Sequence, residues 1–187
     1  MLDEEYQPQQ LPDYGARAQP ALVARMTPQL RLTQAGNVVA VLAIAASIGA
    51  IATFPDYTGT STGSGWAVAS LITSLVLLGI CTFQHMAWLR AMAEWRGERD
   101  YDLASLTRVS WILHIVSYAV VLFGLYATIA GSIAAGTTAT AASLLAFALL
   151  FMVVAQVLAG VQYLRISGPP GTIPAHLRRL TQLRGRG

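Results

Sequence analysis

Residues 66–132 read WAVASLITSLVLLGICTFQHMAWLRAMAEWRGERDYDLASLTRVSWILHIVSYAVVLFGLYATIAGS. Two apolar runs, 66–92 and 109–132, lie on either side of a short charged segment. Each run is longer than the roughly 20 residues that an α-helix needs to cross a bilayer core. We therefore expect the two runs to form an antiparallel transmembrane hairpin, around which the rest of the chain is organised.

The composition of the whole chain is also typical of a membrane protein. Of its 187 residues, 55% are hydrophobic and only 11% are charged, whereas a soluble domain carries about 25% charged residues. This length has room for one compact bundle with short tails, and not for a second domain. The lone cysteine, Cys81, lies in an apolar run, so we expect neither a disulfide nor a cysteine-based zinc site within the chain.

Two further apolar runs flank the hairpin. The run 36–54 is rich in small residues, and pairs such as Ala45/Gly49 and Ala46/Ala50 have the four-residue spacing that lets helices approach closely in lipid. The last run ends at Arg165, before a Ser-Gly-Pro-Pro-Gly segment that stops a helix.

The predicted fold class is an all-α integral membrane protein with a four-helix transmembrane bundle. We place the bundle at residues 35–166, between a polar N-terminal tail (1–34) and a basic C-terminal tail (167–187). Part of the C-terminal tail has the spacing of a short amphipathic helix. The four expected spans are 36–54, 66–92, 109–132 and 139–165.

The arginines predict the orientation in the membrane. The links 55–65 and 134–138 carry no basic residue, and they fall on one side of a four-span bundle. All twelve arginines lie in or beside the N-terminal tail, the central charged segment and the C-terminal tail, which fall on the other side. Basic residues stay on the cytoplasmic side. We expect a multi-pass protein of the plasma (inner) membrane of a bacterium, with both termini cytoplasmic.

Two histidines are the sharpest candidate site. His85 precedes Arg90 and His114 follows Arg108, so both lie at similar depth near one membrane face. In the third span the small and polar residues share one stripe, which points His114 into the bundle. The half of the bundle near the arginines is expected to gather its polar side chains in one layer: Asn37, Gln84, His85, His114, Tyr118 and Gln156.

Ionisable groups within spans are costly and often functional. One interpretation is that His85 and His114 bind a haem b iron from opposite faces, or hold a quinone by hydrogen bonds. A second is a minor transporter or channel with a proton or solute path. The third, which the sequence favours, is structural: the histidines bond neighbouring helices, and no cofactor and no metal is bound.

The leading functional hypothesis is a non-catalytic accessory subunit of a larger bacterial membrane complex, possibly of the respiratory chain. The chain has no Gly-rich phosphate loop, no cysteine pair and no metalloprotease His-Glu pattern, so we expect no enzymatic activity. The expected partners are other integral membrane subunits, and anionic lipids that bind the C-terminal arginines at the cytoplasmic face. No nucleic-acid partner is expected.

The four tryptophans are expected to lie at the membrane–water interfaces. Trp66 is the first residue of the second span, on the side without arginines, whereas the other three lie close to the central charged segment. Tryptophan is enriched at both interfaces, where its amphipathic ring anchors a helix. The residues predicted to anchor the arginine-bearing side are Trp88, Trp95 and Trp111.

Overall fold

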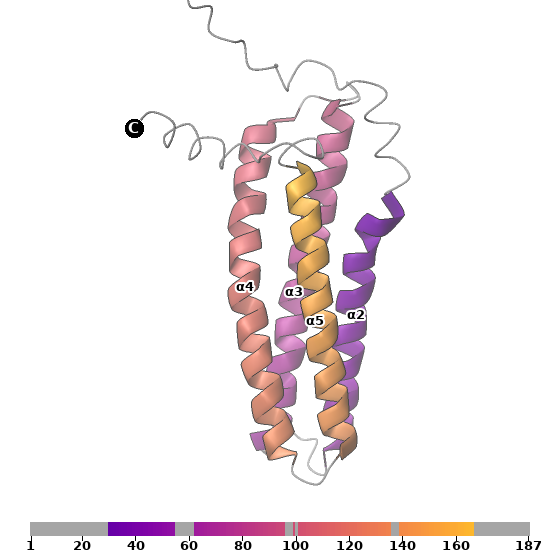
Figure 1. Cartoon of the computed structure of the whole chain (residues 1–187), viewed down its shortest axis with the longest axis vertical. Helices are drawn as coiled ribbons and strands as arrows, with labels where there is room; N and C mark the ends of the chain where they lie inside the picture. The colour runs from indigo at the N-terminus through magenta and orange to yellow at the C-terminus, as the bar shows by residue number, and fades with distance from the viewer. Residues whose placement is uncertain (1–29, 55–61, 96–98, 100, 136–138, 167–187) are drawn as a thin grey trace, which may run out of the picture.

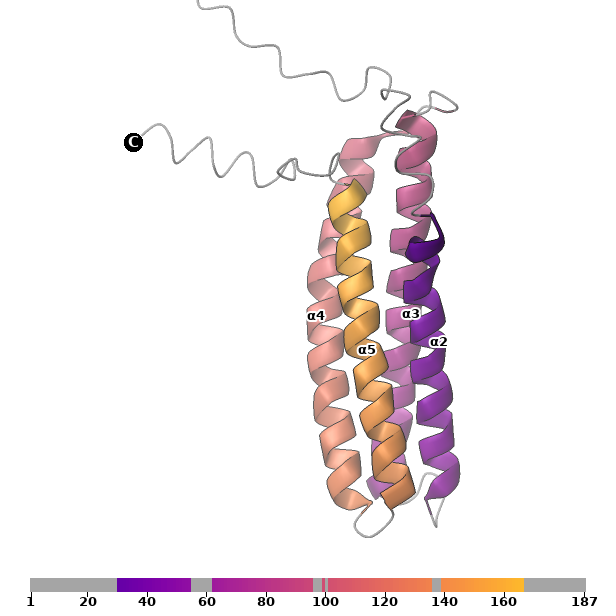
Figure 2. The ribbon, with the colours of Figure 1, turned by 45° about the vertical axis from the view of Figure 1, so that its right-hand side comes forward.

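The computed structural model describes residues 30–54, 62–95, 99, 101–135 and 139–166. Within this part the chain forms four long helices that run side by side in alternating directions (Figures 1 and 2). Each helix contains a stretch long and apolar enough to cross a membrane. The prediction of an all-α fold is confirmed for the described residues, and four helices of this length and composition are compatible with a multi-pass membrane protein. The helices are α2 (Leu30–Thr53), α3 (Thr62–Trp95), α4 (Leu103–Ala134) and α5 (Ala139–Ile166).

The helices extend beyond the predicted apolar runs. Residues 30–34, which we assigned to the N-terminal tail, form the start of α2, and α3 and α4 begin before Trp66 and Val109. An α-helix satisfies its backbone hydrogen bonds internally, so it does not have to end where its apolar run ends. It can continue into polar residues at either end of the run. At the start of α4, Asp102 caps the helix: its Oδ1 accepts a hydrogen bond of 3.2 Å from the Ser105 amide. Residues 1–29 and the C-terminal tail lie outside the described residues.

The two ends of the bundle differ in charge. Arg90, Arg99 and Arg108 are exposed where α3 ends and α4 begins, and we call this the arginine end. At the far end, α2 and α4 end and α3 and α5 begin (Figure 1). The 34 residues of α3 extend about 51 Å at 1.5 Å per residue, whereas a bilayer core is about 30 Å thick. Both views show α3 and α4 continuing past α5 at the arginine end.

The four helices surround a narrow core. α3 and α5 contact each other, and each of them also contacts both α2 and α4. α2 and α4 therefore occupy opposite corners of the bundle. The main core cluster comes from α2, α3 and α5, and small residues dominate it: Ala40, Ala43, Ala46, Leu77, Cys81, Ala148, Met152, Ala155 and Ala159.

The small residues of α2 face the neighbouring helices along one side only. Ala46 and Ala50 are buried, as the four-residue spacing predicted, and a Cβ atom built on Gly49 would lie 3.3 Å from Leu144 Cδ1. Ala45 is exposed, so its predicted role in close packing is wrong. Its position along the helix points it away from the face that Ala46 presents to the core.

The buried face that the sequence predicted for α4 is confirmed. Its small and polar residues are buried, while Ile112, Val116 and Phe123 on the other sides are exposed. At Gly124, α4 lies close to both α3 and α5: a Cβ atom there would lie 2.7 Å from Met152 Sδ and 2.9 Å from Thr73 Cγ2. The small and polar residues buried on this face are Ser110, Ser117, Gly124, Thr128 and Gly131.

Candidate functional site

Buried polar side chains gather in the half of the bundle near the arginine end. Several of their atoms have no hydrogen-bond partner within the described part of the protein. These atoms are Gln84 Oε1, His85 Nδ1, Trp88 Nε1, Ser110 Oγ, His114 Nδ1, and Oε1 and Nε2 of Gln156. We call the six residues the polar cluster.

Gln84 links α3 to α4 in this cluster. Its side chain is fully buried, and its Nε2 donates a hydrogen bond of 2.8 Å to the backbone oxygen of Ser110. The amide oxygen, Oε1, has no partner among the described residues. Trp88 lies one turn further along the same face of α3. The hydrogen bond from Gln84 to Ser110 thus fixes the register between α3 and α4, and it leaves Gln84 Oε1 as an acceptor without a partner among the described residues.

His114 packs between α4 and α5. Its ring stacks on Tyr163, with the centroids 5.0 Å apart and the planes 16° apart. The hydroxyl of Tyr118 lies 3.3 Å from His114 Nε2. Gly160 provides the space for the ring, because a Cβ atom at this position would lie 3.0 Å from His114 Cε1. The imidazole therefore has one occupied nitrogen, Nε2, and one buried nitrogen without a partner, Nδ1.

His85 lies on a different side of α3 from Gln84, since successive helical residues are about 100° apart. It shares its face with Cys81, four residues earlier. The sulfur of Cys81 lies 3.7 Å from the backbone oxygen of Ala155 and 3.7 Å from where a Cβ atom of Gly36 would be. This face of α3 is therefore directed toward α2 and α5.

Within the described residues, no hydrogen bond or ring contact joins His85 to His114. Their proposed joint binding of haem or quinone stays a prediction. No group of three His, Cys, Asp or Glu side chains suited to a metal ion occurs in the described part of the chain.

The predicted single polar layer is wrong in two members. Tyr118 is 51% exposed on the outer surface of α4, and it reaches the layer only through its contact with His114. Asn37 is only half-buried, and it accepts a hydrogen bond of 3.4 Å from Thr82 away from the polar cluster. Gln156 is buried as predicted, on the face of α5 that also carries Gly160.

One predicted interfacial anchor is also wrong. Trp88 is fully buried, and it belongs to the polar cluster rather than to an aromatic belt. Trp111 is exposed, as expected for an anchor, while the Trp95 side chain lies outside the described residues. Trp88 follows Gln84 by four residues and Cys81 by seven, so it shares the side of α3 on which these two residues are buried.

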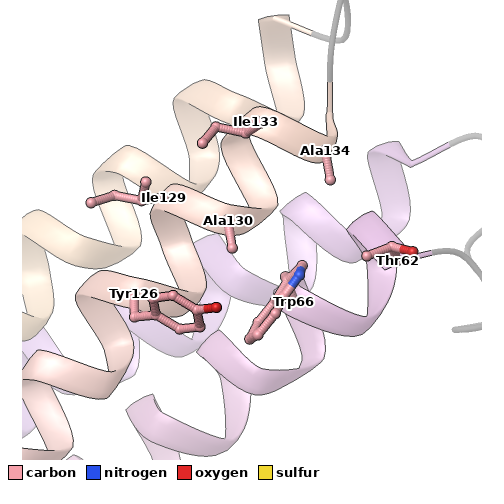
Figure 3. Close-up of a pocket in the computed structure, with 7 residues that line it drawn as sticks. All are labelled: Thr62, Trp66, Tyr126, Ile129, Ala130, Ile133 and Ala134. Atoms are coloured by element: carbon pink, nitrogen blue, oxygen red, sulfur yellow. The ribbon is translucent and has the colours of Figure 1, made fainter.

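A second feature, which the sequence did not reveal, is a groove between α3 and α4 at the far end (Figure 3). It has a volume of about 410 Å³. Trp66 and Tyr126 meet edge to face at its side, with their ring centroids 5.1 Å apart and the planes at 87°. The lining is almost entirely apolar: Thr62, Trp66, Tyr126, Ile129, Ala130, Ile133 and Ala134.

Comparison with known proteins adds no further assignment. No protein-family model, no curated protein and no solved structure matches this chain. The arrangement of helices, the polar cluster and the groove therefore carry the functional argument.

Proposed function

We propose that this chain is a non-catalytic accessory subunit that packs α4 against a transmembrane helix of a larger bacterial membrane complex. The observation that carries the proposal is the exposure of α4. Only 22% of its apolar span is buried inside the bundle, against 33% to 39% for the other three helices. A helix that its own chain covers so little has most of its surface available to a partner.

The exposed surface of α4 has the pattern of a helix-packing seam. Large residues recur along it at steps of three and four, which keeps them on one side of a helix. We call this set the α4 stripe. Its members are all exposed: Trp111, Ile115, Tyr118, Leu122, Tyr126, Ile129 and Ile133.

The residue types of the α4 stripe favour protein over lipid as its neighbour. Aromatic residues are enriched in protein interfaces and often dominate their energetics. Three of the seven members of the α4 stripe are aromatic: Trp111, Tyr118 and Tyr126.

The groove beside Tyr126 strengthens this argument. Ile129 and Ile133 belong both to the α4 stripe and to the lining of the groove. In helix packing, a large side chain of one helix enters a depression on the next. The groove of about 410 Å³ is the depression into which we propose that a large apolar side chain of the partner inserts.

The orientation belongs to the same proposal. The exposed arginines of the arginine end, Arg90, Arg99 and Arg108, support a cytoplasmic location for this end. The bundle then lies in the bacterial plasma membrane with both termini inside, and the groove opens in the outer leaflet. A complex of the respiratory chain is the class of partner that we propose for it.

The haem or quinone alternative has less support. It requires His85 and His114 to face one ligand, but His85 lies on the side of α3 that faces α2 and α5. The ring face of His114 is covered by Tyr163, and its Nε2 is in contact with Tyr118. We therefore propose the accessory subunit in preference to a two-histidine cofactor protein.

Photo-crosslinking in native membranes tests the proposal. A photoreactive amino acid replaces Leu122 of the α4 stripe in one variant, and Val157 of α5 in the matched control. Both side chains are apolar and strongly exposed, at 65% and 60%. We expect a discrete protein adduct from position 122 and none from position 157. The proposal is wrong if position 122 yields no protein adduct, or if both positions yield the same one.

A further inference from the structure

The two halves of the bundle differ in how fully their buried polar side chains are hydrogen-bonded. Toward the far end the buried hydroxyls are paired: Ser47 Oγ lies 3.0 Å from Ser70 Oγ, and Ser74 donates to the backbone oxygen of Ser70 at 2.9 Å. Thr73 and Thr128 also donate to backbone oxygens in their own helices. Unpaired atoms of the polar cluster, in contrast, come from α3, α4 and α5 near the arginine end.

Such a concentration of unpaired atoms needs a physical explanation. More than 90% of buried backbone polar groups, and most buried side-chain ones, have a partner in folded proteins. Leaving a buried polar atom unpaired destabilises the folded protein, and hydrocarbon supplies no partner. Gln84, Trp88 and Ser110 are fully buried, so bulk lipid headgroups do not reach them directly. A small molecule must therefore enter the bundle to satisfy them.

The chemistry of the polar cluster identifies the class of this molecule. Trp88 Nε1 and Gln156 Nε2 are donors, Gln84 Oε1 and Gln156 Oε1 are acceptors, and Ser110 Oγ is both. No carboxylate or guanidinium belongs to the cluster, and Arg90 and Arg108 are exposed at the surface. A site with donors and acceptors but no charge suits a neutral molecule that both donates and accepts. Water has this property and is small enough to fit between packed helices.

The position of the cluster gives the direction of entry. Gln156, its deepest member, lies about 15 Å from the end of α5 at 1.5 Å per residue. Beyond it the core closes: Leu77, Leu145 and Met152 are fully buried, and Met152 closely approaches Gly124. Access from the far end is therefore blocked by apolar side chains, while the arginine end lies next to water.

We propose that water enters the bundle from the arginine end and hydrates the polar cluster as far as Gln156, where Met152 and Leu77 close the path. This water-filled inlet connects His114 Nδ1 with the aqueous phase on the arginine side. The inlet is a feature of the chain itself and is independent of the partner proposed for α4.

Matched serine-to-cysteine substitutions test the inlet. In a Cys81→Ala chain in membranes, Ser110→Cys places a thiol in the polar cluster, and Ser74→Cys places one in the paired half. Both serines are fully buried. A small water-soluble methanethiosulfonate should modify position 110 about tenfold faster or more, because a thiol reacts as the thiolate, which needs water to form. Equal, slow modification at both positions would overturn the proposal.

A second measurement uses the unsubstituted chain, so its result does not depend on whether a cysteine variant folds correctly. Hydroxyl radicals generated from water by radiolysis oxidise side chains that ordered or bulk water touches. Trp88 and Leu145 are both fully buried; Trp88 belongs to the polar cluster, whereas Leu145 belongs to the apolar core toward the far end. We expect oxidation of Trp88 and protection of Leu145. Protection of both residues would show that the cluster is dry and that the inlet does not exist.

Discussion

The imidazole of His114 and the phenol ring of Tyr163 lie face to face, with their centroids 5.0 Å apart and 16° between their planes. This stack joins α4 to α5 near the arginine end. It depends on Gly160, because a Cβ atom there would lie 3.0 Å from His114 Cε1. His114 therefore holds two helices in register, and the absence of a side chain at position 160 makes this possible.

The first prediction concerns this glycine. Gly160→Leu should lower the free energy of unfolding by about 1–3 kcal/mol, because the added side chain overpacks the His114 site. Thermal unfolding followed by circular dichroism in detergent measures the change. Gly79→Leu is the matched control, since a Cβ atom at Gly79 meets nothing within 4 Å and replacing a helical glycine gains about 0.5–1 kcal/mol. Equal losses in both variants would contradict the role of Gly160.

A second prediction compares two adjacent alanines of α2. Ala46 belongs to the core cluster, whereas Ala45 is exposed. Ala46→Leu should separate α2 from the helices that it packs against and destabilise the bundle by about 1–3 kcal/mol. Ala45→Leu should leave stability unchanged, because its side chain points away from the core. The same unfolding measurement decides the matter, and similar stabilities for the two variants would refute the assigned face of α2.

The third prediction tests the orientation. Single cysteines at Thr60, Thr137 and Gly97 are introduced into a Cys81→Ala chain and labelled in intact cells with a membrane-impermeant maleimide. Positions 60 and 137 should react from outside, and position 97 only after permeabilisation, because segments rich in basic residues stay on the cytoplasmic side of a membrane. Labelling of position 97 in intact cells would reverse the proposed topology.

The fourth prediction concerns anionic lipids. A peptide of residues 172–187 contains Arg178, Arg179, Arg184 and Arg186, and each is attracted to an anionic surface by about 1 kcal/mol. Co-sedimentation should show tighter binding to anionic than to neutral vesicles, with less binding at high salt because charges are then screened. In the control peptide the four arginines are replaced by glutamine, and it should lose this preference. Equal binding of the two peptides would exclude an electrostatic role for the segment.

The sequence was informative wherever the property is local to one helix. Four apolar runs predicted four helices, and the period of small and polar residues in α4 predicted its buried face, from Ser110 to Gly131. Both inferences need only the length of a run and the 3.6-residue turn. The cap at Asp102 is of the same kind, because it depends on a contact between residues three apart.

Inferences about relations between helices succeeded less often. His85 and His114 lie in the helices predicted for them, but no hydrogen bond or ring contact joins the two within the described residues. Trp88 was assigned to an interface and is buried. Each helix has a rotation about its own axis, and the sequence gives this rotation only where polar and apolar residues separate clearly. In α3 the apolar residues surround the helix, so its sequence leaves the rotation open.

By itself, the sequence determined that this chain forms long apolar helices with Arg90, Arg99 and Arg108 at one end of the bundle, because hydropathy and charge are set residue by residue. Only the tertiary structure decided that His114 stacks on Tyr163, that Gln84 donates to Ser110, and that Trp66 and Tyr126 flank a groove. Each of these contacts joins residues from different helices. Which side chains meet there depends on helix rotation and register, and the packing of all four helices fixes these together.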